Sequence, residues 1–102
     1  MVGDADIHVW LDMVERVNPP VIIPYVQSDE EQSLGFRVRV VQKGRSGRSV
    51  IGQSGALRLL PGTPAELSRV SIRPQPDSQC DIEIILTRNN MKELHYRFEC
   101  PT

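Results

Sequence analysis

Apolar and polar residues alternate along most of this chain, with the two-residue period of β-strands that bury one face. Residues 5–14, 21–27 and 36–42 are predicted strands. The first places Ile7, Val9, Leu11 and Met13 on one face, and the third places Phe36, Val38 and Val40 inward with Arg37 and Arg39 outward. No segment sustains a 3.6-residue period over three turns, so we expect an all-β protein with little or no helix.

Proline and glycine mark where these strands end or bend. Pro24 lacks an N–H, which predicts that residues 21–27 lie at a sheet edge or contain a bulge. Residues 43–48 are predicted to be a hairpin loop, and residues 49–60 one strand broken by a bulge near Gly52 or Gly55. Residues 67–72 predict a further short strand with Arg69 and Arg73 outward, which brings the expected total to about seven strands.

The last two strands predict a single hairpin register. If Thr87 faces Glu93, three apolar pairs form on one side, while Glu83 faces Arg97 on the other. A one-residue slip would place apolar residues against polar ones. The same register sets Cys80 opposite Cys100, at the cost of one like-charge pair, Asp81 with Glu99.

A disulfide between Cys80 and Cys100 is therefore expected. It would close a loop of about 20 residues, stabilise the domain by about 3 kcal/mol, and imply an oxidising compartment. The alternative is two reduced, buried cysteines in a cytosolic protein. A redox enzyme is less favoured, because catalytic cysteine pairs usually lie close together in sequence.

The length of 102 residues fits one domain, residues 1–102, and is too short for two. No apolar run approaches the roughly 20 residues that span a bilayer, so no membrane insertion is expected. Residues 1–6 show no basic leader or apolar run of a secretory signal, and such a signal would have been removed from this chain.

The net charge of −1 conceals an uneven distribution. Residues 1–31 sum to −6, residues 32–73 to +7 and the last 29 residues to −2. The basic stretch predicts a positive surface for a partner. The alternative is that acidic and basic strands interleave in space and cancel one another. The basic residues of the stretch are Arg37, Arg39, Lys43, Arg45, Arg48, Arg58, Arg69 and Arg73.

Catalytic and metal-binding patterns are not found in the sequence. His8 and His95 match no zinc spacing, neither Gly-x-x-Gly segment is a nucleophile elbow or a phosphate loop, and the carboxylates form no motif. We expect no enzyme activity, no metal and no cofactor. Nucleic acid is also disfavoured, because the pI is about 6.1 and no aromatic residues are interleaved with the basic ones.

Trp10 lies on the outward face of the first predicted strand. It could anchor a partner, as tryptophan often does at interfaces. It could equally cover the edge of the core, which is the preferred interpretation.

The middle of the chain resembles the CsgC-like curli proteins. The resemblance rests on Gly44-Arg-Ser-Gly-Arg-Ser49, Gln53, Ala56-Leu-Arg-Leu-Leu-Pro61, Pro64-Ala-Glu-Leu67 and Val70-Ser-Ile72, and extends over about residues 32–100. It implies an immunoglobulin-like antiparallel β-sandwich in the periplasm that keeps curli subunits from nucleating amyloid before export. Some relatives carry a Cys-x-Cys pair early in the third strand. Residues 33–36 here read Ser-Leu-Gly-Phe, so a redox role of that pair is not carried over.

The residues and the resemblance lead to one hypothesis. A monomeric, chaperone-like inhibitor would bind the acidic curli major subunit, or its early oligomers, through a basic strand surface and compete with cross-β pairing. The contact surface is assigned to Arg37, Arg39, Lys43, Arg45 and Arg48, with Arg58, Arg69 and Arg73 as extensions. Two alternatives remain open, a thiol-disulfide oxidoreductase of the curli system and a structural adhesion subunit.

Overall fold

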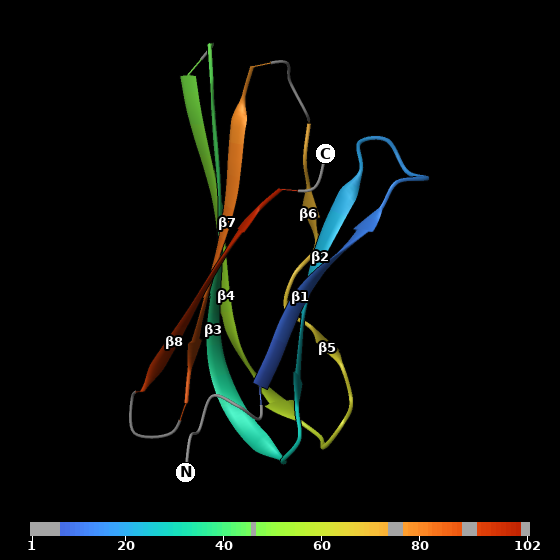
Figure 1. Cartoon of the computed structure of the whole chain (residues 1–102), viewed down its shortest axis with the longest axis vertical. Coiled ribbons are helices and arrows are strands. Elements are labelled where there is room, and N and C mark those ends of the chain that lie inside the picture. The colour runs from blue at the N-terminus through green and yellow to red at the C-terminus, as the bar shows by residue number, and fades with distance from the viewer. Residues whose placement is uncertain (1–6, 46, 74–76, 89–91, 101–102) are drawn as a thin grey trace.

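The computed structural model describes residues 7–45, 47–73, 77–88 and 92–100, and every regular element in these ranges is a strand. Predicted features at residues 5–6, 74–76 and 89–91 lie outside the described residues. The strands are all antiparallel (Figure 1). They are β1 (Ile7–Val14), β2 (Val21–Ser28), β3 (Gln32–Gly44), β4 (Gly47–Leu59), β5 (Ala65–Glu66), β6 (Val70–Ser71), β7 (Gln79–Thr87) and β8 (Glu93–Glu99).

The strands form two sheets that enclose one hydrophobic core. The first sheet has the order β1-β2-β5, with β6 also pairing to β2, and the second has the order β4-β3-β7-β8. Alternate residues of each strand point between the sheets, as the two-residue period predicts. This arrangement confirms the all-β, sandwich-like fold. Its most deeply buried side chains include Ile22, Val26, Leu34, Val38, Val40, Leu59, Ile82, Ile84 and Leu86.

The last hairpin has the register that the sequence predicts. Ile82 pairs with Phe98 and Thr87 with Glu93, and the disulfide joins Cys80 to Cys100 with their Cα atoms 5.3 Å apart. The like-charge pair of Asp81 and Glu99 also forms. A guanidinium nitrogen of Arg97 lies 3.1 Å from the Asp81 carboxylate, which offsets that repulsion.

The predicted bulge in residues 49–60 is wrong, because β4 is one continuous strand of 13 residues. Its register with β3 is constant from Gln32 opposite Leu59 to Gly44 opposite Gly47. A glycine in a strand often marks a bulge, but it can also make room for a neighbour. The Phe36 ring lies over Gly55, where an added Cβ would come within 3.1 Å of the ring. Gly55 therefore accommodates an aromatic ring without interrupting the ladder.

The placement of Pro24 at a sheet edge or bulge is also wrong, because β2 is the central strand of its sheet. The missing N–H falls between β5 and β6, where the ladder on that side of β2 is interrupted. There the Pro24 carbonyl accepts a hydrogen bond from the Leu67 N–H at 2.8 Å. The strand expected at residues 67–72 is reduced to the two-residue β6. A further two-residue strand, β5, precedes that range, which gives eight strands within the described residues.

Candidate functional site

Three basic residues of β3 lie on the outward face of the second sheet. Arg37, Arg39 and Lys43 are exposed, whereas the intervening Val38 and Val40 are buried. The strict alternation of this strand produces the arrangement, because successive side chains of a strand point to opposite faces. The predicted stripe of positive charge on one strand face is therefore present in the fold.

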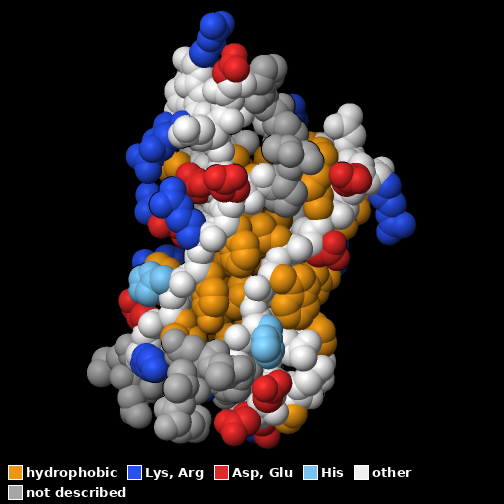
Figure 2. Space-filling model, viewed as in Figure 1, with side chains coloured by type: hydrophobic (Ala, Val, Ile, Leu, Met, Phe, Trp, Pro, Cys, Tyr) orange, Lys and Arg blue, Asp and Glu red, His pale blue; other side chains and the backbone are white. Residues whose placement is uncertain are grey.

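The β3–β4 hairpin brings the other two predicted contact residues next to this stripe. Arg48 of β4 stands directly opposite Lys43 of β3, and Arg45 lies in the short turn between the strands. The five residues therefore gather on one hairpin, and Figure 2 shows Lys and Arg side chains along one flank of the upper half of the molecule, with carboxylates nearby. We call Arg37, Arg39, Lys43, Arg45 and Arg48 the basic hairpin.

The neutralisation of the basic hairpin is incomplete. Arg39 lies 3.8 Å from the Glu83 carboxylate of β7. Within the described residues, no ion pair or side-chain hydrogen bond joins Arg37, Lys43, Arg45 or Arg48 to another group. The acidic and basic strands therefore do not cancel along most of this hairpin, and its cations face solvent.

The three extension residues are less suited to the same surface. Arg58 is held at the far end of β4 by Glu31, with 2.7 Å between nitrogen and oxygen. Arg69 lies between β5 and β6 on the first sheet and forms a bidentate ion pair with Glu66. This hydrogen bonding by Arg69 lowers the pKa of the Glu66 carboxyl from its ordinary value. Arg73 follows β6, so neither Arg69 nor Arg73 continues the basic hairpin.

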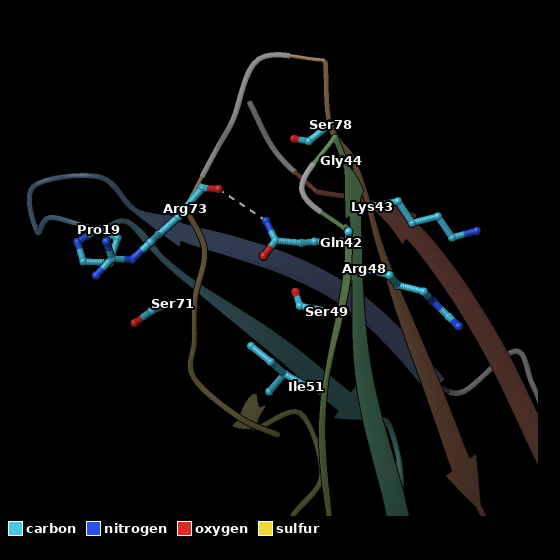
Figure 3. A pocket seen from close by; sticks show the side chains of 11 residues that line it. Pro19, Gln42, Lys43, Gly44, Arg48, Ser49, Ile51, Ser71, Arg73 and Ser78 are labelled. Carbon is cyan, nitrogen blue, oxygen red and sulfur yellow. Dashed lines mark hydrogen bonds between the residues drawn. The ribbon is translucent and has the colours of Figure 1, made fainter.

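A cleft of about 600 Å³ opens on the inward side of the hairpin, opposite the face that carries Arg37 and Lys43. In Figure 3, Gln42, Ser49 and Ile51 project from β3 and β4 toward Arg73, whereas Lys43 and Arg48 point away. The Gln42 side-chain amide donates a hydrogen bond to the Arg73 carbonyl at 3.4 Å. The cleft arises because the first sheet leaves the end of this hairpin uncovered. Its lining combines polar groups with the exposed side chain of Ile51.

The exposed edge strand β4 is a feature that the sequence reasoning missed. Residues 47–56 are all exposed, and residues 49–57 carry no charge. Because the sequence predicts a strand broken by a bulge here, it does not indicate this continuous uncharged run. No signal in this segment indicates an edge, because edge strands are commonly marked by charged residues and this run has none.

Trp10 lies far from the basic hairpin in the topology, on the outward face of β1. Its ring stacks on Tyr25 of β2, with centroids 5.6 Å apart and planes 13° from parallel. The two residues are cross-strand partners and both are half-buried. Trp10 therefore packs within its own sheet, while part of its ring remains accessible to solvent.

The described residues contain no group of three or more His, Cys, Asp or Glu side chains arranged to hold a metal ion. His8 is exposed on β1, and His95 is exposed on β8 with its ring 3.2 Å from the Glu93 carboxylate. In the same described part of the chain, no helix is long and apolar enough to cross a membrane. The described surface therefore offers charged and hydrogen-bonding side chains.

The fold is similar to that of two solved curli proteins. The Escherichia coli curli protein CsgC aligns with a TM-score of 0.77 and 20% identity, over 90% of this chain and 97% of that one. The solution structure of Rhodopseudomonas palustris CsgH aligns with a TM-score of 0.72 and 10% identity, over 91% of each chain.

No protein-family description and no curated protein sequence matches the chain. The structural similarity nevertheless confirms the CsgC-like fold that the sequence segments imply. The sequence segments predict CsgH as the nearer relative, whereas CsgC has the higher TM-score and identity of these two structures.

Proposed function

We propose that this protein is a periplasmic, chaperone-like inhibitor that delays amyloid formation by the curli major subunit. It binds the acidic subunit or its early oligomers as a monomer, and it changes no covalent bond. The observation that carries the proposal is the basic hairpin, in which four of five cations have no carboxylate partner within the described residues. The fold shared with two curli proteins supports the choice of client.

The spacing of the cations fits an extended partner. Side chains on one face of a strand repeat every two residues, or about 6.7 Å. Arg37 and Arg39 repeat at this interval, and so do alternate carboxylates of an extended acidic segment. The unpaired charges also act at a distance, because a concentrated positive field raises the encounter rate with acidic chains. Inhibition at low ratios follows if the rare early oligomers are the target.

The disulfide supports the choice of compartment. Cys80 and Cys100 are joined at the paired ends of β7 and β8, and the Cys100 N–H donates to the Cys80 carbonyl at 3.0 Å. Disulfides of this structural kind persist in oxidising environments such as the periplasm.

Two measurements distinguish the proposal from its alternatives. A thiol-disulfide oxidoreductase would expose a reactive Cys80 or Cys100 after mild reduction, and thiol labelling of the native protein detects such a group. A structural adhesion subunit would assemble with itself, and sedimentation at high concentration detects the assembly. The proposed inhibitor remains monomeric and unlabelled.

Thioflavin fluorescence of purified curli major subunit, with this protein at low molar ratios, tests the function directly. The wild-type protein should lengthen the lag. Arg37→Glu should lose most of that delay, because it replaces an unpaired cation of the basic hairpin. Arg69→Glu makes the same change in charge on the first sheet and should retain the delay. Added salt should weaken the wild-type effect.

An unchanged lag with the wild-type protein would contradict the function. Equal loss of the delay in both variants would instead show that net charge matters and the basic hairpin does not. Circular dichroism of each variant confirms that the fold is intact before the comparison.

A further inference from the structure

The strand register determines which backbone groups of β4 face outward. In an antiparallel sheet each residue directs its N–H and C=O to one neighbouring strand, and successive residues alternate between neighbours. The hydrogen bond from the Cys100 N–H to the Cys80 carbonyl shows that the even-numbered residues of β7 direct their backbone groups to β8. The odd-numbered residues of β7 therefore direct their backbone groups to β3, where they pair with odd-numbered residues. The even-numbered residues of β3 are left to bond β4, and their partners there are the odd-numbered residues of β4. The even-numbered residues therefore point their backbone groups away from the sheet: Arg48, Val50, Gly52, Ser54, Ala56 and Arg58.

These outward groups belong to the last strand of the second sheet, and no described segment pairs with them. The edge strand has 13 residues, and its register with β3 is constant along its whole length. Val50 is 47% exposed and Ile51 is 41% exposed, with their side chains on opposite faces of the strand. A strand added to this edge would meet backbone N–H and C=O groups along its length. It would have Val50 beside it on one face of the sheet and Ile51 on the other.

Another edge of the same fold is protected in the usual way. The opposite edge strand β8 carries a titratable side chain at every second position, from Glu93 to Glu99. Charged edge residues are a common device against unwanted pairing. β4 lacks that device between Arg48 and Arg58, although it is the longer edge.

We infer that the open edge of β4 accepts an extended segment of an acidic polypeptide as an additional β-strand. Backbone bonds to the even-numbered residues would provide affinity, as in other strand-addition complexes. Arg48, Arg37 and Lys43 lie on the same face and would select acidic side chains. Arg58, at the other end of β4, already pairs with Glu31. The inference rests on the proposed function for its acidic client and adds the mode of binding.

A second copy of this chain fits the edge poorly. Antiparallel pairing of two β4 strands about Gln53, over the whole uncharged run, would set Arg48 opposite Arg58 of the second copy. The same repulsion would occur again at the other end. The pairing of Arg58 with Glu31 offsets part of this repulsion. A second copy still sets a guanidinium opposite Arg48, whereas an acidic strand can set a carboxylate there, so charge complementarity favours the acidic partner.

Backbone amide exchange, followed by NMR, tests the inference on the unmodified protein. The probe is a nine-residue synthetic peptide in which Glu alternates with Val or Thr, and the control peptide has Lys in place of Glu. In the free protein, the even-numbered amides of β4 should exchange fast and the odd-numbered ones slowly, at all protein concentrations. The acidic peptide should slow the even-numbered amides, and the control peptide should leave them unchanged.

Proline provides a second test, because it removes an N–H without changing charge. At Val50 the N–H points outward, so Val50→Pro costs no bond to β3, whereas Val50→Thr keeps the donor. The loss of one backbone hydrogen bond, and the disturbance of its neighbours, should weaken binding of the acidic peptide to V50P about fivefold or more. V50T should bind as the wild-type protein does. Circular dichroism shows whether V50P folds, and if it does not, the exchange pattern of the wild-type protein decides.

Binding of the acidic peptide without protection of the even-numbered amides would overturn the inference, and so would equal affinity in a folded V50P. Protection that appears with rising protein concentration alone would also overturn it in favour of a second copy. The proposed function fails separately. If Arg37→Glu loses the delay of curli fibrillation and V50P keeps it, the function stands and strand addition is wrong. If the wild-type protein causes no delay while the even-numbered amides are protected, strand addition stands and the function is wrong.

Discussion

Lys43 and Arg48 face each other across the β3–β4 hairpin, two positive charges at one cross-strand pair. Both side chains are exposed, and neither has a carboxylate partner within the described residues. The alternation of the ladder makes this a non-hydrogen-bonded pair, the type in which side chains approach most closely. Like charges at such a position destabilise the sheet. The pair therefore lowers the stability of the fold while it raises the positive field of the basic hairpin.

Lys43→Glu should consequently make the protein more stable and a weaker inhibitor. Replacing repulsion from Arg48 by attraction should raise the free energy of unfolding by about 0.5 kcal/mol. Urea denaturation measures the gain, and the curli fibrillation lag measures the loss of function. Lys43→Gln removes the repulsion alone and should fall between the two. A less stable K43E protein would contradict the account of the pair.

Loss of the Cys80–Cys100 disulfide should destabilise the domain without changing its binding surface. The bridge closes a loop of about 20 residues, for which chain entropy predicts about 3 kcal/mol. The double variant C80A/C100A should therefore unfold at lower urea than the oxidised wild-type protein. Reductant should lower the stability of the wild-type protein and leave the double variant unchanged. Equal stability of the double variant and the oxidised wild-type protein would contradict the prediction.

The register of the last hairpin could be predicted from sequence because several constraints coincide there. Apolar pairs, an opposite-charge pair and two cysteines are all satisfied by one alignment of β7 with β8. A period of two leaves no neighbouring register that keeps the apolar residues on one face. The inward and outward faces of β3 follow from the same rule.

The environment of β4 and β2 could not be predicted in this way, because it depends on contacts between distant segments. Gly55 lies under the Phe36 ring, a contact that the sequence does not indicate. Pro24 is compatible with a central strand only because its ladder is interrupted between β5 and β6. No sequence pattern identifies the ion-pair partner of a single arginine. The pairing of Arg58 with Glu31 and of Arg69 with Glu66 could therefore be identified only from the fold.

Two glycines of β4 should respond oppositely to the same substitution. A Cβ at Gly55 would lie 3.1 Å from the Phe36 ring, so Gly55→Val should displace the ring and cost about 1 to 2 kcal/mol. At Gly52 the nearest atom is the Val38 carbonyl oxygen, 3.9 Å away. Gly52→Val should therefore be neutral or stabilise the strand by about 0.5 kcal/mol. Thermal unfolding of the two variants distinguishes them, and equal destabilisation would contradict the proposed contact.

Trp10, the single tryptophan, should not sense the binding of an acidic partner at β4. Its ring stacks on Tyr25 on the outward face of the first sheet, whereas β4 is the edge of the second. Tryptophan emission should therefore remain unchanged when the acidic peptide saturates the protein, although it should change on unfolding in urea. Trp10→Leu should retain peptide binding and lose about 1 kcal/mol of stability with the ring contact. A shift of the emission on binding, together with weaker binding by W10L, would instead assign the partner to the first sheet and make Trp10 its anchor.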